Sequence, residues 1–238
     1  MSDPLSKAPE KIAGMFDRIG PSYDRMNGVM TFGRHGAWRR AAAREVARDL
    51  AGGGRALDAC TGTADLALSI RREVPGATVV GTDFSQGMLT VGRAKTAGDP
   101  RIRLARADTL RLPFADAAFR SATVGWGIRN VADVSAALRE LLRILAPAGR
   151  LHVLESARPA GWFGRLGFRL YFRGVVPWLG RLLARNAADA YNYLPKSAEA
   201  FAPAEEFAGL MRGSGFADVS WRSFAFGGVT LHSGTRPP

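Results

Sequence analysis

Between residues 55 and 156 the chain alternates short apolar stretches with longer amphipathic ones, and this alternation limits the fold more than any other feature. Short apolar stretches predict strands, and apolar residues at helical spacing predict helices. Strands separated by helices form a parallel sheet that is covered on both faces, so we expect an α/β fold. The predicted strands are 55–60, 77–83, 102–108, 119–126 and 150–156, and the predicted helices are 64–74, 85–97 and 134–146.

The two ends of the chain differ from this central pattern. Residues 10–50 have helical spacing with a break at GPSYDRMNG, so we expect residues 1–50 to form a helical cap before a main domain of residues 51–238. A further helix is predicted at 203–214, and two strands joined at Gly227 and Gly228 are predicted within 216–235. The expected fold therefore ends in a hairpin.

The composition excludes several kinds of site. Cys60 is the single cysteine, which rules out internal disulfides and a cysteine-rich zinc site. The three histidines, His35, His152 and His232, are far apart in sequence, and we expect no metal site. No apolar run is long enough to span a membrane, and the first residues lack an apolar signal segment, so we expect a cytoplasmic protein.

The formal net charge of +12 indicates an anionic partner, such as nucleic acid, phospholipid or an acidic substrate. An arginine-rich composition also arises in GC-rich genomes, so the charge alone does not choose among them. In the stretch 158–198, arginines alternate with apolar and aromatic residues. Such a basic amphipathic insertion suits peripheral contact with an anionic membrane surface, and the alternative is a substrate-side cap whose arginines are solvated.

The first predicted strand is followed by a glycine-containing turn and a helix start. Ligands of parallel sheets bind at the carboxyl ends of the strands. Gly62 allows the backbone to approach a ligand closely, and the helix start behind it favours a negative group such as a carboxylate. Asp58, at the end of the strand, can bind a cation such as an amino group. The sequence G-x-G-x-x-G is absent, so an ordinary βα turn is the alternative.

Two further acids follow predicted strands. Asp83 ends the second strand, where a carboxylate accepts hydrogen bonds from ribose hydroxyls, and the alternative is a helix N-cap, a role that Ser85 also fills. Asp108 can accept a hydrogen bond from an adenine amino group, with Leu110 and Leu112 flanking the ring, and the alternative is an acid in a loop. Together the segments predict a cofactor that contains a nucleoside.

These segments resemble the S-adenosylmethionine-dependent methyltransferases that have a seven-stranded Rossmann-like sheet. The chain is more closely similar to the menaquinone/ubiquinone biosynthesis C-methyltransferase family. This resemblance covers about Met15 to Thr235, and it rests on MFDRIGPSYDRMN, FGRHGAWRR, GWGIRNV, YNYLPKSAEAF and GGVTLHSG. It implies S-adenosyl-L-methionine as the cofactor and a seven-stranded, mostly parallel sheet.

The positions that match the family's cofactor-binding motifs are Thr63, Asp83, Asp108 and Thr109. The chain departs from the family at two further positions. Ala64 stands where the family usually has glycine, and alanine is tolerated where the position serves helix packing. Gly125 replaces a serine, so one hydrogen bond to the cofactor is expected to be missing.

The resemblance implies C-methylation of the ring of a polyprenylated demethylquinol, with demethylmenaquinol as the expected acceptor. The alternatives are another phenolic or polyketide-like acceptor and, from the charge alone, an RNA methyltransferase. We expect no nucleic acid partner, because no RNA-binding module is appended. We expect a cytoplasmic protein with peripheral contact to the inner face of the cell membrane, and a homodimer stays open.

The resemblance also implies the catalytic residues. A fixed charge on Arg129 would lower the pKa of the quinol hydroxyl and stabilise its oxyanion, and Asn130 would orient the hydroxyl or a water molecule. The alternative for Arg129 is a salt bridge to Asp133. His35 matches a family position and is the candidate general base, and the alternative is packing against Trp38.

Four further residues are assigned to the walls of the site. Tyr23 and Asp24 are expected in a lid over the cofactor, and Tyr191 and Tyr193 are expected to border the quinone ring. Packing in the aromatic core is the alternative for the tyrosines.

Overall fold

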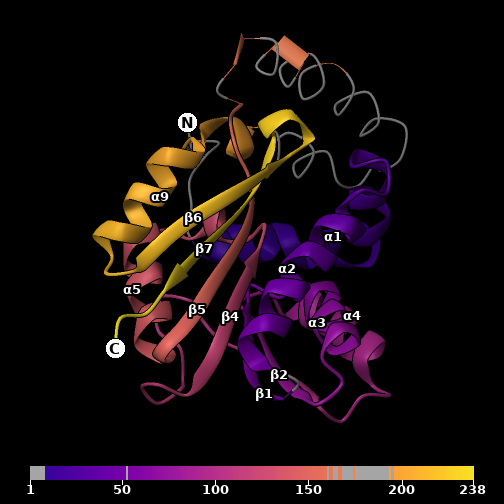
Figure 1. Ribbon diagram of the computed structural model, residues 1–238. Coiled ribbons are helices and arrows are strands. Elements are labelled where there is room, and N and C mark those ends of the chain that lie inside the picture. The colour runs from indigo at the N-terminus through magenta and orange to yellow at the C-terminus, as the bar shows by residue number, and fades with distance from the viewer. Residues whose placement is uncertain are drawn as a thin grey trace.

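The computed structural model describes residues 9–51, 53–159, 161–162, 166–167, 174, 193 and 196–238. Within these residues, seven strands form one sheet in the order β3-β2-β1-β4-β5-β7-β6 (Figure 1). The five strands from β3 to β5 are parallel neighbours, and β7 pairs antiparallel with β5 and β6. The predicted seven-stranded, mostly parallel α/β sheet is therefore confirmed. The strands are β1 Gly54–Ala59, β2 Ala77–Asp83, β3 Ile102–Arg106, β4 Phe119–Gly125, β5 Leu145–Ser156, β6 Ala217–Phe224 and β7 Val229–Thr235.

Helices cover both faces of the sheet. Neighbouring residues of a strand point to opposite faces, and on β1 both sets are apolar and pack against helices. On β1, Leu57 packs with α5 and α9, and Ala56 packs with α2 and α3. Figure 1 shows these two pairs of helices on the two sides of the sheet. None of the described helices has the length and apolar character needed to cross a membrane. The helices are α1 Pro9–Met30, α2 His35–Leu50, α3 Asp65–Glu73, α4 Gln86–Thr96, α5 Val134–Ile144 and α9 Ala204–Gly213, with short 3-10 helices η1 Ile128–Asn130 and η3 Ala225–Gly227.

Helix α1 contradicts the predicted break at GPSYDRMNG. The helix continues unbroken through this stretch, and the chain turns at residues 31–34 instead. Packing explains the difference, because Ile19 is buried and Gly20 lies against the backbone of α4, where an added Cβ would be 3.3 Å from the carbonyl oxygen of Gly87. The tight packing of this helix outweighs the weak helix propensity of glycine.

Strand β5 begins five residues before its predicted start. The expected helix 134–146 ends at Ile144, and Leu145 already pairs with Phe119 of β4. The pairing then shifts register between Phe119 and Ser121. The residues APAG at 146–149 have the composition of a turn, so the sequence pattern placed the strand after them.

Buried polar contacts anchor α2 to the sheet. Asp49, in the last turn of α2, accepts a hydrogen bond from Ser121 Oγ at 2.7 Å, and its Oδ2 also lies 2.7 Å from His152 Nε2. The other ring nitrogen of His152 lies 2.8 Å from Ser233 Oγ. These contacts join the last turn of α2 to β4, β5 and β7. They fix the helix on the sheet, so that its other end, the start of α2, lies beside the carboxyl edge.

Candidate active site

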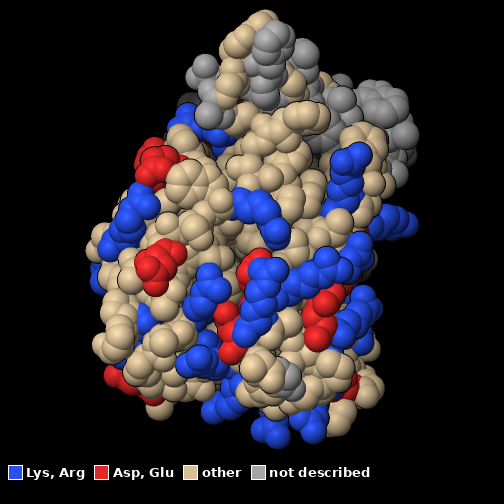
Figure 2. Space-filling model, viewed as in Figure 1, with Lys and Arg blue, Asp and Glu red and all other residues tan. Residues whose placement is uncertain are grey.

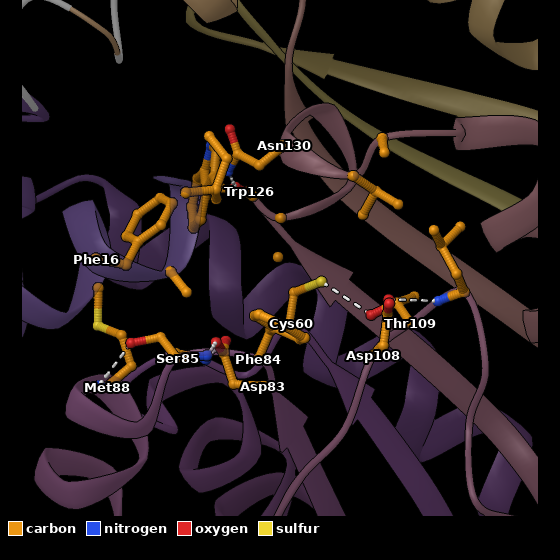
Figure 3. A pocket seen from close by; sticks show the side chains of 18 of the residues that line it. Phe16, Cys60, Asp83, Phe84, Ser85, Met88, Asp108, Thr109, Trp126 and Asn130 are labelled. Atoms are coloured by element: carbon orange, nitrogen blue, oxygen red, sulfur yellow. Dashed lines mark hydrogen bonds between the residues drawn. The ribbon is translucent and has the colours of Figure 1, made fainter. Parts of the chain in front are cut away.

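A cavity that is open to solvent lies at the carboxyl ends of the parallel strands. Figure 3 shows Asp83 and Asp108 on one side of the cavity and Trp126 with Asn130 across from them. Helix α1 supplies a further wall, through Ile12, Ala13, Phe16 and Tyr23.

The turn between β1 and α3 brings backbone to the cavity. Cys60, Gly62 and Ala64 all have positive φ, at 53°, 56° and 64°. A Cβ added to Gly62 would meet no atom within 4 Å, so the turn faces open space there. The left-handed conformation costs about 1 kcal/mol for a residue other than glycine. Ala64, the departure from the family, therefore adopts the conformation that glycine prefers.

Asp58 lies beneath this turn and is fully buried. Its carboxylate accepts hydrogen bonds from Thr61 Oγ1 at 2.5 Å and Thr123 Oγ1 at 2.8 Å. Burial raises the pKa of Asp58 to about 6, although these hydroxyls oppose the shift. The residue also borders a smaller cavity beside the first, together with Arg39 and Gly62. The hydrogen bonds of Asp58 hold the turn in place. The sequence predicted another role for Asp58, a direct contact with an amino group of the ligand.

Asp83 and Asp108 both line the large cavity, as the positions of the strand ends predicted. Asp83 accepts hydrogen bonds from the backbone N–H groups of Gly62 and Ser85, each at 2.8 Å, and burial raises its pKa. Asp108 accepts a hydrogen bond from the N–H of Leu110 at 2.9 Å. Each carboxylate oxygen has more than one lone pair, so both acids keep acceptor capacity for a ligand.

Three neighbouring details refine the sequence analysis. Ser85 is the N-cap of α4, so Asp83 is not needed in that role. Leu110 lines the cavity, where it can flank an adenine ring. Leu112 is in the apolar core and cannot. Thr109 Oγ1 lies 3.3 Å from Cys60 Sγ, and burial raises the pKa of that thiol to about 12. The thiol is therefore neutral at physiological pH.

The stretch GWGIRN forms the opposite wall. Gly125, Trp126, Gly127 and Asn130 line the cavity. A Cβ added to Gly127 would overlap the Cβ of Cys60, so only glycine lets the two segments approach this closely. Asn130 Oδ1 accepts a hydrogen bond from the hydroxyl of Tyr193 at 3.2 Å.

Arg129 differs from both of its predicted environments. Its guanidinium is buried and pairs with the fully buried Glu155, and Nη1 also donates to the carbonyl oxygen of Trp126 at 2.9 Å. Asp133, the alternative partner, instead caps α5 by accepting a hydrogen bond from the N–H of Ala136. Arg129 is not among the described residues that line the cavity. Its charge is therefore balanced by a carboxylate just behind the wall.

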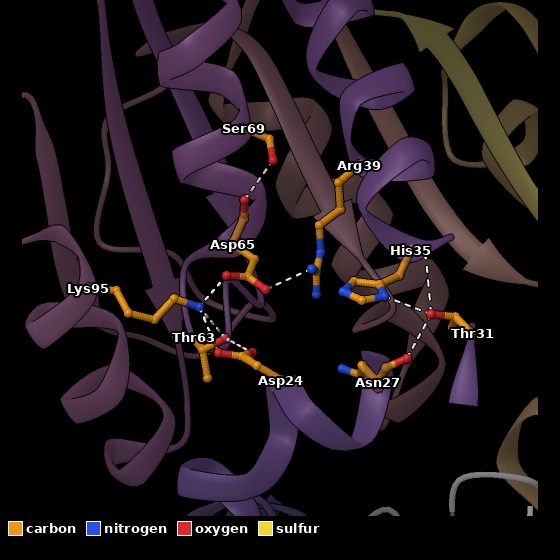
Figure 4. Close-up of polar contacts among 9 residues, drawn as sticks. All are labelled: Asp24, Asn27, Thr31, His35, Arg39, Thr63, Asp65, Ser69 and Lys95. Atoms are coloured by element: carbon orange, nitrogen blue, oxygen red, sulfur yellow. Dashed lines mark hydrogen bonds and ion pairs between the residues drawn. The ribbon is translucent and has the colours of Figure 1, made fainter. Parts of the chain in front are cut away.

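His35 stands at the start of α2, outside the described lining of the cavity. Its Nδ1 lies 2.7 Å from Thr31 Oγ1, and burial lowers the pKa of the ring (Figure 4). Trp38, the alternative packing partner, packs against the ring of Trp126. The described hydrogen bonds of His35 are both with Thr31, which is not among the described residues that line the cavity.

Asp24 joins α1 to the glycine turn. It accepts hydrogen bonds from Thr63 Oγ1 at 2.6 Å and from Lys95 Nζ at 2.8 Å (Figure 4). Lys95 also pairs with Asp65, which forms a second ion pair with Arg39 at 2.7 Å. The residues predicted to form a lid thus come from a helix that is held against the turn by charged groups.

Several contributors to the site were missed by the sequence analysis. Glu155 looked like an ordinary strand residue, and Phe16, Phe84 and Met88 carried only the signal of helical or turn patterns. Tyr191 and most of the insertion 158–198 lie outside the described residues. No group of three or more acidic, histidine or cysteine side chains suited to a metal ion occurs in the described parts of the chain.

The strand order and the cavity at the carboxyl edge define a Rossmann-like α/β fold whose ligand lies at the carboxyl ends of the strands. A solved structure from Thermotoga maritima, a SAM-dependent methyltransferase described as a possible histamine N-methyltransferase, has the same fold. Its TM-score is 0.64 over 94% of this chain and 99% of that chain, at 22% identity.

The chain belongs to the ubiE/COQ5 methyltransferase family, whose model matches residues 5–236. It is 45% identical to the demethylmenaquinone methyltransferase of Thermus thermophilus, over 94% of this chain and all of that protein. It is 41% identical to the ubiquinone/menaquinone biosynthesis C-methyltransferase UbiE of Geobacter sulfurreducens, over 98% of this chain and 91% of that protein. The resemblance stated from the motifs is confirmed, and the chain is an enzyme that uses S-adenosylmethionine.

Proposed function

We propose that the enzyme methylates a ring carbon of a polyprenylated demethylquinol and that demethylmenaquinol is its acceptor. The observation that carries the proposal is the cavity, which joins acceptors for a nucleoside, Asp83 and Asp108, to the polar side chain of Asn130. Tyr193 donates a hydrogen bond to Asn130. The demethylmenaquinone methyltransferases to which the chain is similar support the choice of acceptor.

The cofactor-binding residues in this proposal are those around the glycine turn. S-Adenosylmethionine, when bound, supplies an electrophilic methyl group on its sulfur. Asp83 accepts hydrogen bonds from the ribose hydroxyls, and Asp108 accepts one from the adenine amino group. Gly62 and Thr63 bring backbone towards the methionine part, and Asp58 fixes the turn from below. Thr109 and Gly125 complete the walls beside them.

The acceptor side orients a phenolic hydroxyl. A ring carbon attacks best when its hydroxyl is ionised, so the hydroxyl proton would pass to a water molecule and the carbon would take the methyl group as the methyl–sulfur bond breaks. The ring proton would then pass to water, and the ring becomes aromatic again. The side-chain amide of Asn130 offers an N–H to the developing oxyanion, and Tyr193 orients this amide by donating to its Oδ1. Arg129, paired with Glu155, holds the wall behind Asn130. Alignment of the carbon with the methyl group supplies a further part of the rate.

The arrangement of the chain adds three proposals. Residues 1–50 act as a lid, with Tyr23 and Asp24, over a catalytic domain of residues 51–238. The insertion 158–198, with Tyr191, borders the prenylated acceptor. The protein meets the inner face of an anionic membrane, where its substrate resides, and the net charge of +12 supports this contact. A homodimer is compatible with each of these.

The test is methyl transfer from labelled S-adenosylmethionine to reduced demethylmenaquinone in liposomes, with a short soluble phenol as the competing acceptor. Label in the quinol alone is the expected result. Label in the phenol alone would assign the enzyme to another acceptor class, and label in neither would reject both acceptors.

A further inference from the structure

Glu155 is an acidic residue outside the described lining of the cavity. It is the second-last residue of β5, and its exposed fraction is 0%. A carboxylate without contact to water is costly unless a partner of opposite charge and hydrogen bonds compensate it. Its position at the carboxyl edge of the sheet places it directly behind the wall that GWGIRN forms.

Two of the three described hydrogen bonds to the Glu155 carboxylate come from Arg129. Its Oε1 pairs with the Arg129 guanidinium and accepts a hydrogen bond from the N–H of Ser156 at 2.7 Å. Its Oε2 accepts a longer hydrogen bond from the backbone N–H of Arg129 at 3.4 Å. Glu155 therefore holds both the side chain and the backbone of Arg129, and with the backbone it holds η1.

Arg129 in turn contacts the backbone of the cavity wall. Its Nη1 donates to the carbonyl oxygen of Trp126 at 2.9 Å, and the side chain of Asn130 donates to the same oxygen at 3.4 Å. Asn130 in turn accepts from the hydroxyl of Tyr193 at 3.2 Å. A continuous chain of polar contacts thus runs from the buried carboxylate to Asn130 and Tyr193. Trp126 and Asn130 are both part of the cavity lining.

Stability alone does not require this ion pair. Apolar residues of similar volume often replace a buried ion pair without loss of stability, whereas removal of one partner is strongly destabilising. The contacts of Glu155 also lead towards the cavity rather than into the apolar core. Both observations favour a contribution to the geometry of the reaction.

We propose that Glu155 is a positioning residue for methyl transfer, which acts through Arg129 to hold Asn130 where it meets the acceptor hydroxyl. This inference rests on the proposed function for the identity of the acceptor. It assigns Glu155 no contact with substrate or cofactor. A shift of about 1 Å in the groups that orient a substrate can lower a rate by about 100-fold, which sets the size of the effect.

The test is a double-mutant cycle on kcat with Glu155→Gln, Arg129→Met and the double variant, at saturating S-adenosylmethionine and quinol. Each single variant should lose about 10- to 100-fold in kcat, and the double variant should lose no more than the worse single variant. The affinity for S-adenosylmethionine should stay within about twofold of the parent enzyme, because the residues at Asp83 and Asp108 are untouched. Independent losses that multiply in the double variant would overturn the proposal.

Two further variants keep the result interpretable. Glu155→Asp keeps the charge and should recover part of the lost kcat, even if the Arg129 cation without its partner unfolds Glu155→Gln. Glu205→Gln is the matched control, because it removes an exposed ion pair with Arg212 and should leave kcat unchanged. No recovery in Glu155→Asp, with the protein folded, would count against positioning by charge.

A readout that needs no acceptor separates this proposal from the proposed function. In nuclear magnetic resonance spectra of the S-adenosylmethionine-bound protein, the guanidinium of Arg129 should give slowly exchanging signals that Glu155→Gln abolishes. Failure of the quinol assay with these signals present would reject the acceptor and keep the positioning of Arg129. Signals that are unchanged in Glu155→Gln would reject the positioning itself.

Discussion

Gly127 controls how closely the two sides of the cavity approach. An added Cβ would overlap the Cβ of Cys60, so Gly127→Ala must push η1 away from the β1 end. Because η1 carries Arg129 and Asn130, we expect the rate of methyl transfer to fall by at least about 10-fold. Overpacking should also lower the free energy of unfolding by about 1–3 kcal/mol. Rates at saturating substrates and urea unfolding measure both effects.

A second substitution checks this explanation. Cys60 has a φ of 53°, a conformation that glycine adopts easily, so Cys60→Gly removes the clashing atom at little conformational cost. The double variant Cys60→Gly/Gly127→Ala should recover most of the rate. Gly98→Ala is the control, because its Cβ would meet nothing within 4 Å. A fully active Gly127→Ala enzyme would show that the close approach is unimportant.

Asp58 should make stability depend on pH. Burial raises its pKa from 3.8 to about 6, so the folded state keeps the proton at pH values where the unfolded state has lost it. The free energy of unfolding therefore falls by up to about 3 kcal/mol as pH rises from about 4 to about 6. Above about pH 6 the contribution of Asp58 no longer changes with pH. An asparagine side chain cannot ionise, so the stability of Asp58→Asn relative to the parent should increase between about pH 4 and about pH 6.

Urea unfolding at several pH values in this interval measures the difference. Asp99→Asn provides a control of opposite sign, because the hydrogen bond from Arg71 lowers the pKa of Asp99. Its stability relative to the parent should decrease as pH rises through the acid range below the usual carboxylate pKa. A difference for Asp58→Asn that does not change with pH would contradict the prediction.

The residues at the ends of the parallel strands were predictable, and the partner of Arg129 was not. Asp83 and Asp108 end up on one cavity because the carboxyl ends of parallel strands share an edge. Asp133 was the expected partner of Arg129 because it is close in sequence. Glu155 is 26 residues away and reaches Arg129 only through the pairing of β4 with β5. A local pattern cannot show this register.

At the scale of elements, α1 shows where sequence patterns fail. Gly20 and Pro21 indicate a break, but the helix closes one wall of the cavity without interruption. An added Cβ at Gly87 would lie 2.7 Å from the Cα of Asp17, so the two elements touch backbone to backbone. Such contacts between distant segments reverse a local preference and leave no periodic signal in the sequence.

The contact of Asp24 with the glycine turn predicts how α1 affects the cofactor. Asp24→Asn removes the charge that accepts hydrogen bonds from Thr63 and Lys95. A hydrogen bond to a charged group contributes about 1.5–3 kcal/mol, and part of this should appear as an affinity for S-adenosylmethionine that is about 5- to 30-fold weaker. Isothermal titration calorimetry measures the affinity, and hydrogen exchange should show faster opening of α1.

Glu10 provides the control on the same helix. Its side chain is exposed, so Glu10→Gln removes an acidic charge from α1 without touching the turn. The affinity of this variant should match that of the parent enzyme. Equal weakening by both substitutions would indicate a general effect of charge rather than the contact with Thr63.

At the scale of the whole molecule, the sheet was predictable because its pattern repeats. Five apolar strands with three helices between them define the parallel part, and turn residues before Val229 define the hairpin. The order of the strands depends on which edges meet in space, and no pattern along the chain indicates it. The site, which combines α1, the strand ends and Tyr193, depends on that order.

The distribution of charge predicts how the whole enzyme meets its substrate. Figure 2 shows Lys and Arg side chains spread over the lower and right parts of one face, with a mostly tan area above them. Phe226, in η3 between β6 and β7, is 97% exposed, and its φ of 55° is unfavourable for a bulky residue. A basic protein with an exposed aromatic side chain suits an anionic bilayer that contains a quinol.

We therefore expect the enzyme to float together with vesicles that contain anionic phospholipid. It should not float with zwitterionic vesicles. Binding should weaken several-fold when the salt concentration rises from about 0.05 M to about 0.3 M, because the Debye length shortens. Phe226→Ser should reduce the binding that survives high salt and leave methyl transfer to a detergent-solubilised quinol unchanged, since the side chain is outside the described cavity lining. Equal binding to both kinds of vesicle would show that the net charge does not direct this protein to membranes.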